Sequence, residues 1–275
     1  MGRSRVLARL LATSGLWPLV ALLVVALVGP ELAPRNPLAT DVAHALSPPS
    51  PAHWFGTDQL GRDILSRVLT AGRLDLAIAF AAVSSSAVAG AMIGAVSGFL
   101  GGAVDQILGR LTDVLMAFPL FIVAMALVAV LGNTIANVVY ATAIINLPFY
   151  IRFARAETRA RRHAGYVKAE RLGGASEAEV LFKVLMPALL PGLVVQMSIN
   201  LGWAVLNTAG LSFIGLGIRP PTPEWGALVS EGAQYVLAGQ WWVAAWPGLA
   251  LTGSVLAFSF AGDALRDWTD VRSGS

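Results

Sequence analysis

The chain has 275 residues, of which 56% are hydrophobic and only 13% are charged, and its formal net charge is +3. Soluble proteins average about 45–50% apolar and about 25% charged residues, so this composition excludes an ordinary soluble domain and indicates an integral membrane protein. Cysteine is absent and the three histidines form no pair such as H-E-x-x-H, which argues against disulfides and a resident metal site.

Long apolar runs predict six membrane-spanning helices, because crossing about 30 Å of hydrocarbon takes around 20 residues. The expected helices cover residues 10–30, 76–100, 114–131, 134–152, 188–217 and 241–262. A Gly132-Asn133 turn divides the run that supplies the third and fourth. The whole chain, 1–275, is therefore expected to be one all-α, polytopic membrane domain. A signal peptide is the alternative for the first run, but no small-x-small cleavage motif follows it cleanly.

Basic residues predict the orientation of these spans. Fourteen of the 19 Lys and Arg residues lie in one set of loops and the remaining five in the other. Basic residues are enriched on the cytoplasmic side of membranes. Both termini and the loop 153–187 are therefore expected in the cytoplasm. Because the basic residues lie beside apolar spans, the basic pI indicates membrane topology and no nucleic-acid partner.

The segment 31–73 is then expected to be external. Its first half is rich in proline, which disfavours long helices. Its second half, 57–67, is expected to form a short surface helix on which Arg62 and Asp63 face outward. These two residues fit either a contact with a docking protein or a local salt bridge, which contributes about 0–1 kcal/mol when exposed.

A row of small residues predicts a close helix–helix contact in the second span. Ser86, Gly90, Gly94, Gly98 and Gly102 recur every four residues. Such rows let two helix backbones approach closely, and association within a membrane depends on this packing.

The loop 153–187 contains a helix-start signal. Ser176 and Glu179 form a capping-box pattern, which predicts a helix from Ser176 towards Met186, and Gly173-Gly174 offers a flexible corner before it. On these grounds alone the segment is either a charged loop that anchors topology or a short docking helix across the cytoplasmic face.

Four residues share one face of the fifth expected span: Gln196, Asn200, Trp203 and Asn207. Polar side chains at membrane depth must face protein or water. They are expected either to bridge neighbouring helices or to line a translocation path.

Sequence signals for catalysis are missing. The two lysines, Lys168 and Lys183, do not follow a glycine, so the chain lacks the G-x-x-x-x-G-K-[ST] motif of ATPases. No G-x-S-x-G motif is present either. A membrane enzyme of another kind is a minor alternative, and ATP hydrolysis is expected on separate subunits.

Four stretches carry a common resemblance. They are residues 53–63 (HWFGTDQLGRD), 168–187 (KAE, then Gly174 and Pro187), 210–226 (GLSFIGLG, PP and PEWG) and 262–267 (GDALRD). In this order they resemble the permease subunits of binding-protein-dependent ABC importers, specifically the C-type subunits of dipeptide, oligopeptide and nickel importers. In the cytoplasmic loop, Lys168 stands where the family has Glu and Glu170 where it has Ala.

The resemblance implies a role and a set of partners. It implies a cytoplasmic coupling helix that docks into the ATPase, carried by Lys168, Ala169, Glu170, Gly174, Ala175, Ser176, Glu179 and Pro187. It also implies a homologous permease subunit, two ATPase subunits, an extracytoplasmic solute-binding protein and a prokaryotic inner membrane. No cofactor is expected on this chain, and ATP and Mg are expected on the partners. Di- or oligopeptides are the expected solutes, with nickel as an alternative; a non-transporting scaffold or sensor subunit is the alternative of another class.

Overall fold

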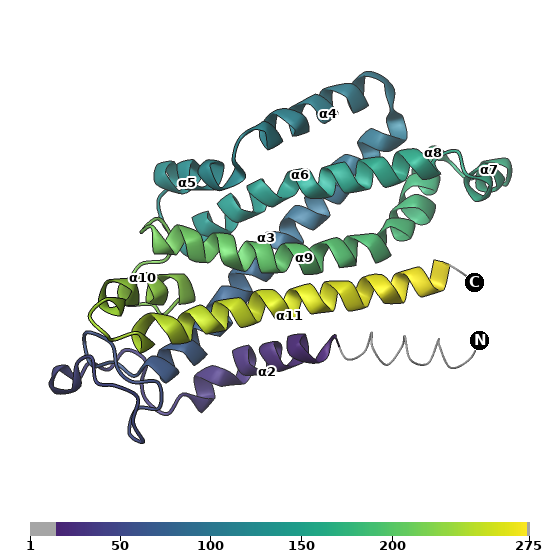
Figure 1. Cartoon of the computed structure of the whole chain (residues 1–275). Coiled ribbons are helices and arrows are strands. Elements are labelled where there is room, and N and C mark those ends of the chain that lie inside the picture. The colour runs from purple at the N-terminus through teal and green to yellow at the C-terminus, as the bar shows by residue number, and fades with distance from the viewer. Residues whose placement is uncertain (1–14, 274–275) are drawn as a thin grey trace, which may run out of the picture.

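The computed structural model describes residues 15–273 of the chain. Within this range the regular elements are helical, and the long helices lie side by side in one bundle (Figure 1). The loop between α2 and α3 and the helix α10 lie at one end of the bundle, and α7 and the C-terminal end of α11 lie at the other (Figure 1). The all-α, polytopic architecture expected from the apolar runs is confirmed.

Four described helices are long and apolar enough to cross a membrane. They are α3 (Ile64–Leu100), α6 (Ile135–Arg161), α9 (Met186–Phe213, counted together with the turns from Glu177) and α11 (Trp242–Ser273). A fifth span requires α4 (Gly102–Ala117) and α5 (Leu120–Leu131) to be counted as one bent pair. The helix α2 (Trp17–Leu32) is apolar but has 16 residues, and the start of the expected span 10–30 lies outside the described residues.

The expected surface helix at 57–67 is wrong. Residues 57–63 form a loop closed by an isolated bridge between Thr57 and Asp63, and α3 begins at Ile64 rather than near residue 76. Gly61, with φ of 72°, lies against the backbone of Asp41, a position that a residue with a side chain could not occupy. Asp63 is the N-cap of α3, and its carboxylate accepts a hydrogen bond from Ser66 N at 2.9 Å.

The expected straight span at 114–131 is also wrong. Two helices cover this region, and they meet at an angle of 87° around Phe118 and Pro119. Proline has no N–H and disfavours helical geometry in the residue before it, and Phe118 is accordingly extended, with φ of −89° and ψ of 146°. The first of the two helices, α4, already starts at Gly102.

The row of small residues forms the expected seam, in which α3 packs against α6. A Cβ atom at Gly90 would lie 2.6 Å from Cβ of Tyr150, and one at Gly94 or Gly98 would overlap a backbone carbonyl of α6. Gly102 is not part of the seam, because it lies beyond the end of α3 with open space around it.

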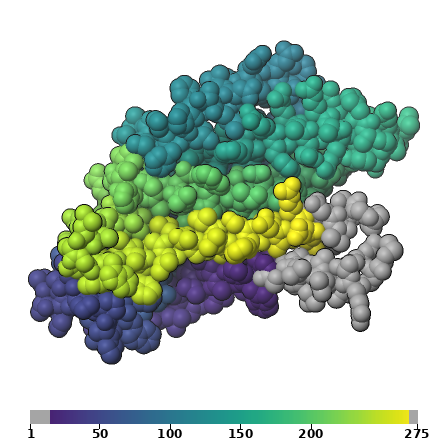
Figure 2. Space-filling view, in the orientation of Figure 1, coloured from purple at the N-terminus to yellow at the C-terminus, as the bar shows by residue number. Residues whose placement is uncertain are grey.

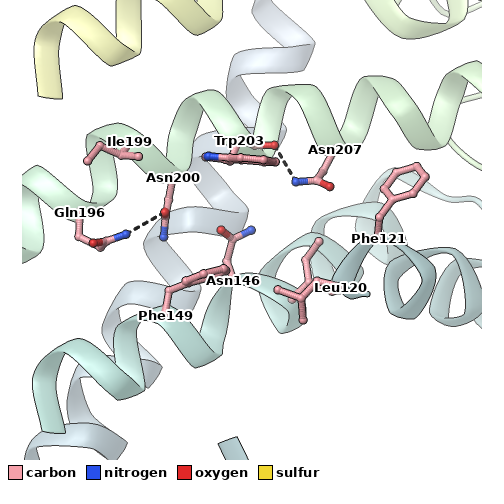
Figure 3. Close-up of a pocket in the computed structure, with 10 residues that line it drawn as sticks. Leu120, Phe121, Asn146, Phe149, Gln196, Ile199, Asn200, Trp203 and Asn207 are labelled. Atoms are coloured by element: carbon pink, nitrogen blue, oxygen red, sulfur yellow. Dashed lines mark hydrogen bonds between the residues drawn. The ribbon is translucent and has the colours of Figure 1, made fainter. Parts of the chain in front are cut away.

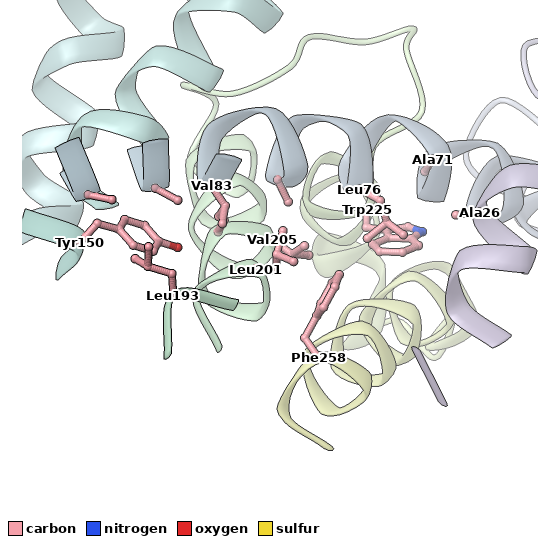
Figure 4. Packing of buried hydrophobic residues seen from close by; sticks show 14 of the residues in the cluster. Ala26, Ala71, Leu76, Val83, Tyr150, Leu193, Leu201, Val205, Trp225 and Phe258 are labelled. Carbon is pink, nitrogen blue, oxygen red and sulfur yellow. The ribbon is translucent and has the colours of Figure 1, made fainter. Parts of the chain in front are cut away.

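The main core surrounds the other faces of α3. Val83, Leu201, Val205 and Phe258 pack together there, with Trp225 towards the end of the bundle that carries α10 (Figure 4). The helix α11 lies between α9 and α2 (Figure 2). The α3–α6 seam and this core give α9 a fixed support, and α9 carries the candidate site.

Candidate translocation pocket and coupling loop

A pocket of about 450 Å³ opens between α5, α6 and α9 (Figure 3). It is lined by Leu120, Phe121, Ile145, Asn146, Phe149, Gln196, Ile199, Asn200, Trp203 and Asn207. The structure therefore brings together all four residues that the polar stripe singled out. None of the lining residues is charged.

Hydrogen bonds along α9 orient the amide groups of the stripe. Gln196 Nε2 donates to Asn200 Oδ1 at 3.0 Å, and Asn207 Nδ2 donates to the carbonyl oxygen of Trp203 at 2.8 Å (Figure 3). Asn200 is buried, and its Nδ2 has no hydrogen-bond partner among the described residues. Trp203 is 61% exposed and forms an apolar wall between the amides. Both bonds join neighbours on α9, and the Asn200 side chain also lies within hydrogen-bonding reach of Tyr150 on α6.

Asn146 of α6 faces the stripe from the opposite wall of the pocket, and the sequence analysis did not single it out. Its Nδ2 donates to the carbonyl oxygen of Thr142 at 2.8 Å. The sequence does mark Asn146 as an amide within an apolar run, two residues before Pro148. A polar residue in such a run is expected to face protein or water rather than lipid. Each carboxamide offers both donors and an acceptor, so the pocket can bind the N–H and C=O groups of a solute without binding a charge.

The loop at the opposite end from α10 contains a short separate helix, α7 (Gly165–Leu172), which includes Lys168, Ala169 and Glu170. The predicted capping box is confirmed: Ser176 N donates to the Glu179 carboxylate at 3.0 Å, and Glu179 N donates to Ser176 Oγ at 3.3 Å. The predicted corner is confirmed as well, because Gly174 has φ of 91°.

The helix predicted from Ser176 towards Met186 is present, but the prediction that it is a separate helix across the face is wrong. It does not lie across the face as a separate helix, because α8 (Glu177–Glu179) and the π-helical turn Val180–Leu185 lead directly into α9. A π turn accommodates the missing N–H of Pro187, which lies in the first turn of α9. The short helix across the end of the bundle is α7.

The loop is anchored to the bundle by apolar and charged contacts that the sequence analysis missed. Val167, Val180 and Leu185 are buried together. The Arg171 guanidinium donates to both Glu177 carboxylate oxygens at 2.9 and 3.0 Å, and to the carbonyl oxygen of Arg162 at 3.1 Å. These contacts fix α7 against the end of α6, α8 and the π turn that precedes α9.

The anchored loop presents an exposed surface. Lys168, Ala169, Glu170, Gly174, Ser176 and Pro187 are exposed, and Ala175 and Glu179 are half-buried. Leu172, at the end of α7, is 90% exposed. The continuous helical segment from Glu177 connects this surface to the pocket.

The prediction that Arg62 and Asp63 face outward is wrong, since they are only 4% and 3% exposed. Asp63 pairs with Nδ1 of His53 at 2.9 Å. Arg62 Nε donates to Asp58 at 2.7 Å and its Nη2 donates to Glu231 at 3.1 Å. Arg62 and Asp63 therefore form separate ion pairs and no salt bridge with each other. Together these buried pairs attach the loop between α2 and α3 to α10.

Comparison with known proteins identifies the family. Residues 90–274 match the model of the binding-protein-dependent transport system inner membrane component. The chain belongs to this family. The resemblance to importer permeases indicated by the four motifs is thereby confirmed. As a member, the chain is a multi-pass inner-membrane permease subunit and not a catalytic one, and membership implies ATPase and binding-protein partners.

Relatives match nearly the whole chain. It is 40% identical over 256 residues to the probable D,D-dipeptide transport system permease protein DdpC of Escherichia coli (strain K12), covering 93% of this chain and 86% of that protein. It is 37% identical over 268 residues to the di/tripeptide transport system permease protein DppC of Pseudomonas aeruginosa (strain UCBPP-PA14), covering 94% and 87%. It is 40% identical over 253 residues to the glutathione transport system permease protein GsiD of Escherichia coli (strain UTI89 / UPEC), covering 91% and 83%.

Proposed function

We propose that this permease subunit passes short peptides across the inner membrane through the pocket between α5, α6 and α9. The observation that carries the proposal is the uncharged, carboxamide-lined wall formed by Gln196, Asn200 and Asn207 opposite Asn146. Peptide N–H and C=O groups are the natural hydrogen-bond partners of carboxamides. The relatives are named for D,D-dipeptides, di- and tripeptides and glutathione, all of which contain amide groups of this kind.

Six spans are part of the proposal. The apolar run 10–30, of which α2 is the described part, makes the first span and the bent pair α4–α5 makes the third. With α3, α6, α9 and α11 the count is even, so both termini and α7 share one side. The excess of basic residues on that side assigns it to the cytoplasm.

A homologous permease subunit completes the path. The pocket opens at the surface of this chain, where Trp203 and Ile199 are 61% and 41% exposed. If these carboxamides faced lipid, the donors and acceptors not used in bonds along α9 would lack partners, which is costly in hydrocarbon. A second permease subunit placed over the open side would enclose the amides between two proteins.

Two ATPase subunits are proposed to dock on α7 and the Gly174 corner. The helical segment from Glu177 to Phe213 is continuous, so a displacement at the loop reaches Asn200 along about 35 Å of helix. Switching between inward and outward access then requires two packings of the bundle that bind ATP states and solute differently. An extracytoplasmic binding protein delivers the solute at the end that carries α10.

Alanine variants of the stripe test the proposed path. Gln196→Ala, Trp203→Ala and Asn207→Ala are reconstituted with the partner subunits, and the uptake of a series of di- and tripeptides is measured at equal membrane abundance. For Gln196→Ala and Asn207→Ala, losing one neutral hydrogen bond of about 0.5–1.5 kcal/mol to the solute should change uptake about two- to tenfold and alter the peptide preference. Trp203→Ala removes an apolar wall of the pocket and should alter the preference for peptide side chains.

Gln234→Ala is the matched control, because this exposed amide on α10 lies outside the pocket. It should transport like wild type. Thermal stability is measured on the same variants. If the stripe serves only helix packing, the variants lose about 0.6 kcal/mol of stability per hydrogen bond with an unchanged peptide preference, and the proposed path is wrong.

A further inference from the structure

Two carboxyl groups meet in the interior where α3, α9 and α10 join. Asp75 of α3 is 2% exposed, and Glu224, immediately before α10 (Trp225–Val236), is 1% exposed. The two groups are within hydrogen-bonding reach of each other. Asp75 Oδ2 accepts from Trp225 N at 3.0 Å, while the two Glu224 oxygens accept from Gly226 N at 3.0 Å and Ala227 N at 2.7 Å.

One oxygen of this pair lacks a partner. Asp75 Oδ1 is buried and receives no hydrogen bond from any described residue. Burying an ionised carboxylate oxygen without a hydrogen-bond partner costs free energy. If Asp75 is protonated, its hydroxyl can instead donate a hydrogen bond to Glu224. The unpartnered Oδ1 therefore favours a protonated Asp75.

No cation faces the pair from the described elements around it. On α3, Arg67 is engaged with Asp58 and Glu231, and Arg73 pairs with Glu31 at the surface. On α10, Glu231 is the only charged residue and pairs with Arg62 and Arg67. The helix α9 has no charged residue and contributes Ser212, and Arg219 of the preceding loop is exposed.

Two buried carboxyl groups without a cation cannot both be ionised at low cost, because their charges repel each other and neither is hydrated. We propose that Asp75 and Glu224 share one bound proton, which makes the junction of α3, α9 and α10 a proton-binding site. The proton lies on Asp75 Oδ1, because the N-terminal N–H groups of α10 favour the ionised form of Glu224. Burial raises the pKa of Glu224, and those N–H groups oppose the rise.

The site holds the outer end of the bundle together. Beside it, Trp225 Nε1 donates to the carbonyl oxygen of Val68 at 3.0 Å, and the indole packs against Gly72 of α3 (Figure 4). Gly226 lies against the backbone of Ala209 on α9. Loss of the proton would place two like charges in this junction, and α9 is the helix that carries the polar stripe of the pocket.

The direction of the pH dependence follows from proton counting. The folded protein holds a proton that the unfolded chain releases above the ordinary carboxyl range. Stability is therefore fully present below the ordinary carboxyl range, and it falls as the pH rises from that range to the pH at which the folded pair itself loses its proton. Within that window the unfolding equilibrium constant rises up to about tenfold per pH unit.

The test uses the full chain in lipid nanodiscs. Infrared spectroscopy at neutral pH should show the carbonyl band of a protonated carboxyl group in wild type, and the band should be absent from Asp75→Asn. The asparagine amide can donate a hydrogen bond to Glu224 in place of the protonated carboxyl group. The unfolding midpoint of this variant should therefore not fall with rising pH as the midpoint of wild type does. Glu31→Gln, in the exposed pair with Arg73, is the matched control and should keep both the band and the decline.

Three results would overturn the proposal. The first is a wild-type spectrum without the band at neutral pH. The second is an Asp75→Asn variant with the pH profile of wild type. The third is a stability that depends on added sodium or divalent cations without the band, which would make the junction a cation site. Should Asp75→Asn fail to fold, Glu224→Gln and the titration of the wild-type band supply the same comparison.

Discussion

A side chain at Gly94 on α3 would overlap the carbonyl oxygen of Ile151 on α6. The two helix backbones are in contact at this point, so the smallest residue is required for a steric reason. Association of helices within a membrane depends on packing rather than on release of water, which makes such a seam a main source of stability.

Replacing Gly94 with alanine should therefore separate the two helices. We expect a loss of about 1–3 kcal/mol of stability, the usual effect of overpacking a well-packed interior. Thermal unfolding in detergent measures this loss. Gly248→Ala on α11 is the control, because its Cβ would meet nothing within 4 Å, and it should be neutral or slightly stabilising. Equal midpoints for the two variants would contradict a tight seam.

Asp63 should act on stability rather than on docking of the binding protein. Its carboxylate caps α3 through Ser66 and pairs with His53 in the interior. Asp63→Ala removes a helix cap of about 1 kcal/mol and leaves His53 without its partner, so a loss of about 1–3 kcal/mol is expected. Asp41→Ala, in an exposed pair with His44, should be near neutral. Weakened binding-protein affinity in a fully stable Asp63→Ala protein would restore the docking role.

Local sequence patterns predicted much of this fold. The Gly132-Asn133 turn predicted the last residue of α5 and the start of α6 to within one residue, because a glycine turn is a local signal. The four-residue repeat of small residues predicted the α3–α6 seam, and Ser176 with Glu179 predicted the start of α8. Both signals lie within a short stretch of the chain.

Contacts between distant parts of the chain could not be predicted in this way. Arg62 is buried because Glu231, 169 residues later, approaches it, and no local pattern contains that partner. The sequence also left open whether the helix that starts after Ser176 is separate from the next span, and the structure joins them through a π turn. Asn146 lines the pocket only because α6 packs beside α9.

The topology predicts three labelling results in intact cells. The absence of natural cysteines gives a clean background for single-cysteine variants. Cysteines at Pro49 and at Leu237, which is fully exposed, should react with an impermeant reagent added outside, and a cysteine at Leu172 should react only after permeabilisation. Trp225 is unsuitable as an outside position because it is buried. Labelling at position 172 in intact cells would invert the proposed orientation.

Gly174 should matter for coupling and little for folding. Its φ of 91° is unfavourable for residues with a side chain, and its Cβ would meet nothing within 4 Å of the chain. Gly174→Leu should therefore insert normally, strain the corner by about 1–2 kcal/mol and obstruct a partner that approaches it. With the ATPase subunits present, we expect ATP hydrolysis to continue while peptide uptake falls.

Two variants separate the causes of that loss. Asparagine tolerates a positive φ better than other residues with side chains, so recovery of uptake in Gly174→Asn would assign the loss to backbone strain, and no recovery would assign it to obstruction of the partner. Gly165→Ala is the control, because Gly165 begins α7 with open space around it and without a positive φ. Full uptake in Gly174→Leu at equal membrane abundance would show that this corner only connects two helices.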